Sequence, residues 1–224
     1  IHMRITFAPI VTARSFATRN RFSIFVVIPA IAVLALGILA AAVRMDAVQT
    51  ATAAGSGKIL AVRAVSALWT MSPDGSGQTQ LPGPCDRNGD WSPDGSKIVC
   101  EHGNSSGLGD LWIMDADGTN AQPSRGRARV KAESPQWSPD GTKVAFHGRP
   151  SPNIGIYAHD VYTVNTDGTG LTQLTFTADA DMYPTWSPDS TKLIWFSNRS
   201  GSSQLWIMNA DGSNQTYLST GTTN

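Results

Sequence analysis

Seven aspartates recur in short polar segments of the sequence, and their carboxylates are the first candidates for chemistry. They are Asp74, Asp94, Asp117, Asp140, Asp167, Asp189 and Asp211. Repeated carboxylates could act as general acids and bases or as calcium ligands. Each one, however, precedes a glycine, or Ser190 at one site, and Asp followed by Gly is typical of a tight turn. Turn formation explains all seven, so we expect no catalytic residue, no metal site and no cofactor.

The other candidate chemical motifs also have a structural explanation that does not involve catalysis or metal binding. Residues 103–107 match the Gly-x-Ser-x-Gly nucleophile elbow, but that elbow needs a strand–turn–helix context, and here the segment is a Gly/Ser-rich loop. His102, His147 and His159 show no metal-binding His-x-His or His-Glu-x-x-His spacing, so we expect them at solvent-exposed edges. Residues 125–131 are a basic run that we interpret as a solvated connection.

Ser190 departs from the turn pattern, because it replaces the glycine found at positions 95 and 141. A residue with a side chain costs about 1 kcal/mol in the left-handed conformation of that turn position. We therefore expect the substitution Ser190→Gly to stabilise the fold.

The aspartate turns belong to a repeat. A motif of the form Trp-Ser-Pro-Asp-(Gly/Ser)-(Ser/Thr)-Lys begins at Trp91, Trp137 and Trp186, with spacings of 46 and 49 residues. A second motif, which ends in Asp-Gly, begins at Leu68, Leu111, Val161 and Leu205. Repetition at a period in the forties is typical of propellers.

Each repeat predicts four short antiparallel strands. The second strands, at 97–100, 143–146 and 192–195, are apolar on both faces. A sheet of such strands must be covered on both sides, which a ring of radially packed sheets achieves. A two-sheet sandwich would explain the strands but not the repeat. The expected fold is all-β, a β-propeller of four-stranded antiparallel blades.

The N-terminal part is a different kind of polypeptide. Residues 22–43 carry no charge, and a helix of this length would cross a hydrocarbon core of about 30 Å. Arginines precede it, so we expect residues 1–21 to be cytoplasmic and the rest of the chain to be outside. A cleavable signal peptide is the alternative, because residues 40–42 and 51–53 offer small-residue cleavage sites. Residues 44–57 read as a linker and 58–224 as the propeller.

Charge follows the same division. The net charge is zero overall, about +4 for residues 1–57 and about −4 for residues 58–224. No basic field is available to hold nucleic acid, so we expect no nucleic-acid partner. The membrane is expected as a partner only through the N-terminal helix.

The two cysteines, Cys85 and Cys100, would meet an oxidising compartment. Pairing across the turn at 93–95 places Cys100 opposite Gly89, four residues from Cys85. Four extended residues span about 13 Å, whereas a disulfide needs Cα atoms within about 7 Å. A disulfide therefore requires the chain before Gly89 to fold back. The sequence alone leaves open whether the two cysteines are bonded or reduced.

The two motifs together resemble the WD-like repeat of the TolB family of β-propellers, over residues 58–218. The resemblance implies an extracytoplasmic six-bladed propeller that works mainly through protein contacts. Residues 58–224 supply about four blades at roughly 46 residues each. They form either a four-bladed ring or a fragment of a six-bladed one, and we expect the fragment.

Two functions fit these observations. The leading hypothesis is a non-catalytic, periplasmic or extracellular propeller, membrane-anchored or secreted, that binds a protein partner or a cell-envelope component. Its binding residues would be the seven turn aspartates, which strand alternation is expected to bring to one acidic end. The alternative is the propeller module of a larger prolyl oligopeptidase-like hydrolase, a family in which similar repeats occur.

Overall fold

The computed structural model describes residues 47–52, 57–63, 67–103, 109–124, 130–150 and 159–218. The chain divides into two compact units, 1–41 and 42–224, and only the second contains described residues. The expected membrane or signal helix at 22–43 lies outside them. Within the described ranges, no helix has the length and apolar character needed to cross a membrane.

The described strands form four antiparallel sheets, each built from four consecutive strands, as the repeat predicts. Sheet 1 contains β1 (Ala47–Thr52), β2 (Ile59–Arg63), β3 (Ala67–Met71) and β4 (Thr79–Gln80). Sheet 2 contains β5 (Gly89–Trp91), β6 (Lys97–Gly103), β7 (Gly109–Asp115) and β8 (Gln122–Pro123). Sheet 3 contains β9 (Val130–Trp137), β10 (Lys143–Pro150), β11 (Asp160–Asn165) and β12 (Thr172–Gln173). Sheet 4 contains β13 (Asp181–Trp186), β14 (Lys192–Ser197), β15 (Gln204–Asn209) and β16 (Thr216–Tyr217).

Sheet 1 begins earlier than its composition predicts. Strand β1 lies inside the segment 44–57 that reads as a linker, and it pairs with β2 through Ala51 and Leu60. The small residues of this segment carry little strand signal, so only pairing with the apolar β2 identifies it as a strand.

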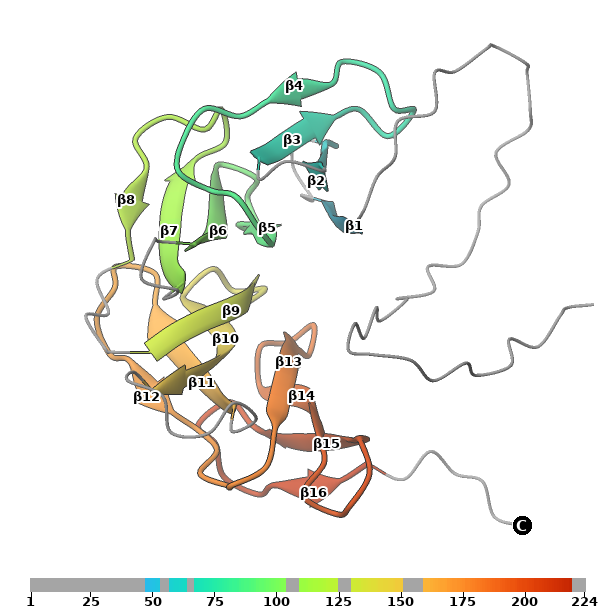
Figure 1. The fold of residues 1–224 in the computed structure, drawn as a ribbon, viewed down its shortest axis with the longest axis vertical. Coiled ribbons are helices and arrows are strands. Elements are labelled where there is room, and N and C mark those ends of the chain that lie inside the picture. The colour runs from blue at the N-terminus through green and yellow to red at the C-terminus, as the bar shows by residue number, and fades with distance from the viewer. Residues whose placement is uncertain are drawn as a thin grey trace, which may run out of the picture. The chain divides into compact units, whose positions relative to one another are not determined.

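Consecutive sheets pack face to face through three apolar clusters. The first joins sheets 1 and 2 through Leu60, Leu68, Ile98, Cys100 and Met114. The second joins sheets 2 and 3 through Val99, Leu111, Val144, Phe146 and Tyr162. The third joins sheets 3 and 4 through Ala145, Val161, Leu193, Trp195 and Met208. The first strands also lie beside one another, β1 beside β5, β5 beside β9 and β9 beside β13 (Figure 1). This is the arrangement of consecutive propeller blades.

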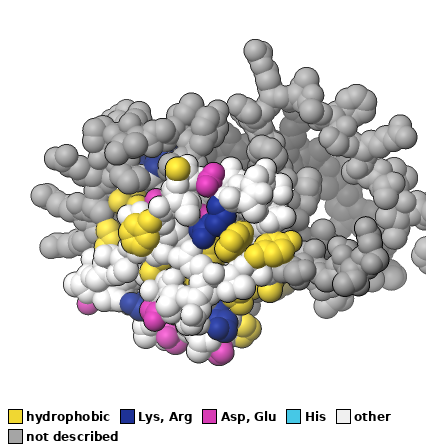
Figure 2. Space-filling view, turned by 90° about the horizontal axis from the view of Figure 1, so that it is seen from below, with side chains coloured by type: hydrophobic (Ala, Val, Ile, Leu, Met, Phe, Trp, Pro, Cys, Tyr) yellow, Lys and Arg dark blue, Asp and Glu magenta, His cyan; other side chains and the backbone are white. Residues whose placement is uncertain are grey.

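One face of sheet 4 has no sheet against it in the part of the chain that the structure describes. Its apolar side chains belong to Ile194, Phe196, Leu205 and Ile207. All four are half-buried, whereas the corresponding Val99 and Ala145 of sheets 2 and 3 are fully buried. Figure 2, a view from below, shows hydrophobic side chains at the surface between acidic and basic ones.

Cys85 and Cys100 form a disulfide, with their Cα atoms 5.8 Å apart. Cys100 pairs with Gly89, as the turn geometry predicts. The chain before Gly89 folds back beside β6, because the Asp86 amide donates to the Glu101 carbonyl and the Glu101 amide donates to the Asn88 carbonyl. This return brings Cys85 to Cys100 and decides the question that the sequence leaves open.

Ser190 adopts the expected left-handed conformation, with φ of 59°. Its hydroxyl has a second role, because Ser190 Oγ accepts a hydrogen bond of 3.0 Å from the Asp140 amide of the neighbouring sheet. Glycine at position 190 would relieve the strain of the left-handed backbone, but it would also remove the hydroxyl that accepts this hydrogen bond. The sequence does not reveal this second effect.

The two effects predict different outcomes for two substitutions. Ser190→Ala removes the hydroxyl and keeps the strained backbone, so it should lower the free energy of unfolding by about 1 kcal/mol. Ser190→Gly removes the hydroxyl and also relieves the backbone, so it should stay within about 0.5 kcal/mol of the wild type. Denaturant unfolding of both variants measures this. Equal stabilities for Ala and Gly at position 190 would show that the backbone term is absent.

Candidate functional site

The turn aspartates bind to their own turns. In each of the seven, Oδ1 accepts the amide and hydroxyl of the residue two positions later, as Asp94 does from Ser96 at 3.0 and 2.9 Å. The same pattern recurs at Asp74, Asp117, Asp140, Asp167, Asp189 and Asp211. Hydrogen bonds lower the pKa of all seven carboxyls. In Asp94, Asp140 and Asp189 the largest contribution comes from the hydroxyl of the serine two positions earlier, which donates at 2.6 Å, and the pKa of Asp94 and of Asp189 falls to about 2. Groups that remain ionised at neutral pH are poor proton donors, which agrees with a structural role in the turns.

The two turns of a sheet lie at the same end. In sheets 2, 3 and 4 the turn after the third strand donates a backbone hydrogen bond to the turn after the first. The pairs are Ala116 to Ser96 at 2.9 Å, Thr166 to Thr142 at 3.1 Å and Ala210 to Thr191 at 2.9 Å. The seven aspartates are exposed, and we call them the aspartate rim.

Lysines stand among the rim aspartates, because the second strands of sheets 2, 3 and 4 begin with lysine. Lys97 forms an ion pair of 2.9 Å with Asp115. Lys143 and Lys192 donate to Asn165 and Asn209 at 2.9 and 3.0 Å. The rim is therefore net negative but not uniformly acidic, which agrees with the lysine at the end of the Trp-Ser-Pro-Asp motif.

The prediction that the histidines lie at exposed edges is wrong for His147, which is only 2% exposed. His147 lies on β10 directly opposite Glu133 of β9. His159, which immediately precedes β11, has a side chain only 13% exposed and reaches the same glutamate. The segments 104–108, 125–129 and 151–158, which include most of the Gly-x-Ser-x-Gly match and of the basic run, lie outside the described residues.

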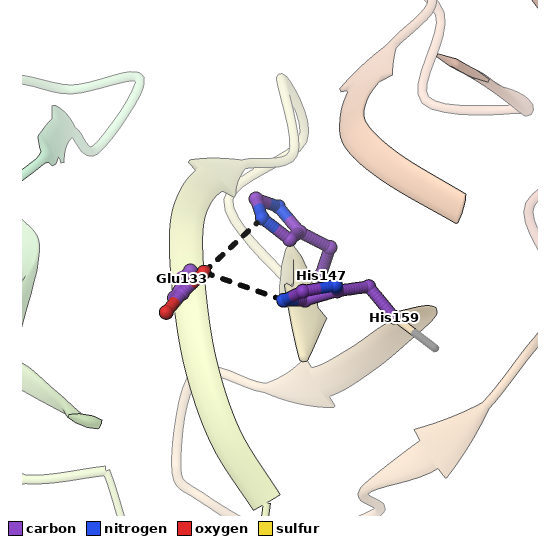
Figure 3. A group of neighbouring side chains, drawn as sticks. All are labelled: Glu133, His147 and His159. Carbon is purple, nitrogen blue, oxygen red and sulfur yellow. Dashed lines mark ion pairs between the residues drawn. The ribbon is translucent and has the colours of Figure 1, made fainter. Parts of the chain in front are cut away.

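Glu133, His147 and His159 form a compact cluster (Figure 3). The Nε2 atoms of both histidines lie 3.6 Å from Glu133 Oε2, and Lys131 Nζ pairs with the other carboxylate oxygen. Burial alone would raise the pKa of the Glu133 carboxyl, but the neighbouring side chains of His147, His159 and Lys131 outweigh it and hold that pKa well below its usual range. Among the described residues this is the group that could hold a metal ion.

A hydrogen bond connects this cluster to the next sheet. The Tyr183 amide of β13 donates to His147 Nδ1 at 3.3 Å. Sheets 2 and 3 are joined in the same way. The Ser134 amide of β9 in sheet 3 donates to the buried Glu101 carboxylate of β6 in sheet 2. Ser134 and Tyr183 both have positive φ, 52° and 57°. Both donors lie at irregularities in a first strand, which turn an unpaired amide toward the preceding sheet.

Burial raises the pKa of the Glu101 carboxyl above its usual value. Its side chain also accepts a bond of 2.7 Å from the Asn88 amide group, but burial dominates and raises the pKa of the Glu101 carboxyl to about 6. The folded protein therefore holds this proton more tightly than the unfolded chain does. The stability that protonation contributes is complete below about pH 4.5 and is lost as the pH rises through 6.

Several known proteins are similar to this chain in sequence or in fold. The family described as the TolB beta propeller domain matches residues 126–224. The Tol-Pal system protein TolB of Bordetella pertussis is 33% identical over 43% of this chain and 31% of its own length. The solved structure of putative TolB from Agrobacterium tumefaciens matches with a TM-score of 0.64 at 20% identity, over 76% of this chain and 61% of that one. Puromycin hydrolase matches with a TM-score of 0.58 at 18% identity, over 74% of this chain and 30% of that one. The chain spans less than two thirds of each relative, and the structural matches establish the fold alone.

The pKa of Glu101 makes a testable prediction. Glu101→Gln cannot ionise, so its free energy of unfolding should rise relative to the wild type by about 2 kcal/mol between pH 4 and pH 7.5. Urea unfolding of both proteins at the two pH values measures the difference. A difference that does not change with pH would show that the carboxyl titrates normally.

Proposed function

We propose that this chain, which carries TolB-like β-propeller repeats, is a non-catalytic scaffold outside the cytoplasm that binds a protein partner or a cell-envelope component. The aspartate rim is the observation that carries the proposal. In sheets 2, 3 and 4 it brings exposed carboxylates, ionised at neutral pH, to the end of the sheet where the two turns meet.

The rim is suited to contact because its carboxylates are held in place. Each turn uses mainly Oδ1, and only Asp94 also uses Oδ2 for a bond inside its turn, to Ser96. The remaining oxygens are exposed at fixed positions, so a partner need not order them on binding, which lowers the entropic cost. Basic groups of a partner protein are the complementary chemistry.

The surroundings of the rim favour a protein over a polyanion. Residues 58–224 have a net charge of about −4, which would repel nucleic acids and other polyanions. The match to a Tol-Pal system protein supports an envelope partner. Residues 22–43 would place the chain outside the cytoplasm as an anchor or a signal peptide.

The competing function is the propeller module of a larger hydrolase, which the likeness to puromycin hydrolase supports at the level of fold. Under this proposal the rim would have no role in partner binding. The experiment below separates the two.

Asparagine substitutions at Asp94, Asp140 and Asp189 should slow partner association without unfolding the turns. Asparagine keeps the Oδ1 acceptor and removes the charge. With a partner isolated by cross-linking in the cell envelope as the probe, we expect the association rate at low salt to fall roughly threefold to tenfold. The salt dependence of that rate should also become shallower. Surface plasmon resonance measures both.

Asp110→Asn is the matched control for the single substitution Asp94→Asn, because each removes one charge from an exposed residue and Asp110 lies at the opposite end of sheet 2. Equal effects of Asp110→Asn and of Asp94→Asn would contradict the proposal. A hydrolytic activity abolished by Ser105→Ala would contradict the non-catalytic scaffold.

A further inference from the structure

We propose that Glu133, His147 and His159 form a zinc site in sheet 3, independent of the aspartate rim. Two imidazoles and one carboxylate are a common protein ligand set for Zn²⁺, with a fourth position left for water or a partner's side chain. The two nitrogens and one oxygen favour Zn²⁺ over Mg²⁺, Ca²⁺ and Mn²⁺, which prefer oxygen ligands.

The distances match shared coordination better than hydrogen bonding. Ligands about 2.0–2.2 Å from a tetrahedral Zn²⁺ lie about 3.3–3.5 Å from one another. Both histidine Nε2 atoms lie 3.6 Å from Glu133 Oε2, and the ligand atoms of all three residues lie within 4.8 Å. A separation of 3.6 Å is too long for a hydrogen bond. The two glutamate–histidine separations are close to that spacing, and the rest of the group, within 4.8 Å, would have to draw together around the ion.

The backbone holds these groups in one place. Glu133 and His147 face each other on paired strands, and the His159 carbonyl accepts the Asp181 amide at 2.7 Å. The Glu133 side chain is 23% exposed, while His147 is nearly buried. An ion could therefore enter from the glutamate side and bind against the histidines.

Two groups compete with the metal. Lys131 neutralises Glu133 in the metal-free protein, but it uses Oε1, so Oε2 stays available for coordination. The ammonium would be repelled by a divalent ion and should move away.

The second competitor is the Tyr183 amide. Because it donates to His147 Nδ1, the neutral imidazole carries its proton on Nε2. Coordination through Nε2 requires that proton to move to Nδ1, so the ring stays neutral and the bond to Tyr183 is lost. His159 meets no such obstacle, because its buried Nδ1 has no hydrogen-bond partner among the described residues and can carry the proton. Zinc binding is thus coupled to the contact between sheets 3 and 4.

Isothermal titration of the chelator-treated full chain with ZnCl₂ tests the site. We expect one ion per chain and a loss of affinity of at least about tenfold in both Glu133→Gln and His159→Ala. His102→Ala, which alters a histidine outside the cluster, should bind as the wild type does. Thermal melting of the metal-free variants verifies that they are folded.

Two spectroscopic measurements identify the geometry. Co²⁺ should give the intense visible absorption of a tetrahedral site in the wild type and not in Glu133→Gln. The Tyr183 amide should exchange faster with solvent when Zn²⁺ is bound, because its acceptor is lost. Absence of saturable binding, or equal affinity in Glu133→Gln and the wild type, would overturn the proposal.

Discussion

The structure depends on one constraint: the central strands of each sheet are apolar on both faces, so no sheet can be stable alone. Val99 of sheet 2 packs on sheet 3, while the adjacent Ile98 packs on sheet 1. Because side chains alternate along a β-strand, each sheet has two apolar faces, and sheets 2 and 3 each pack between two neighbours. Stacking in chain order follows, as do the short polar turns that the chain needs between strands.

Polar groups are organised around this apolar packing. Where first strands become irregular, the amides of Ser134 and Tyr183 need buried acceptors, and Glu101 and His147 supply them from the preceding sheet. Buried polar side chains are retained where they satisfy such amides. The same sheets expose the turn aspartates at one end, so packing and surface chemistry are separated along each strand.

The sequence predicts what is local and misses what depends on register. The turns, the four-strand repeat and the pairing of Cys100 with Gly89 follow from motifs within a few residues. The histidine cluster does not, because the β9–β10 ladder shifts by one residue between Ala145 and His147. Without that irregularity His147 would face Ser134 and not Glu133. The sequence carries one signal of this irregularity, Pro135 within β9, because a proline inside a strand often marks a bulge.

The central claim, that neighbouring sheets stabilise each blade, is tested most directly by two matched truncations in sheet 4. Leu193 is fully buried against sheet 3, while Leu205 lies on the face with no described neighbour. Denaturant unfolding of the full chain should show that Leu193→Ala loses about 2–5 kcal/mol and Leu205→Ala no more than about 1 kcal/mol. Equal losses for the two variants would contradict the account.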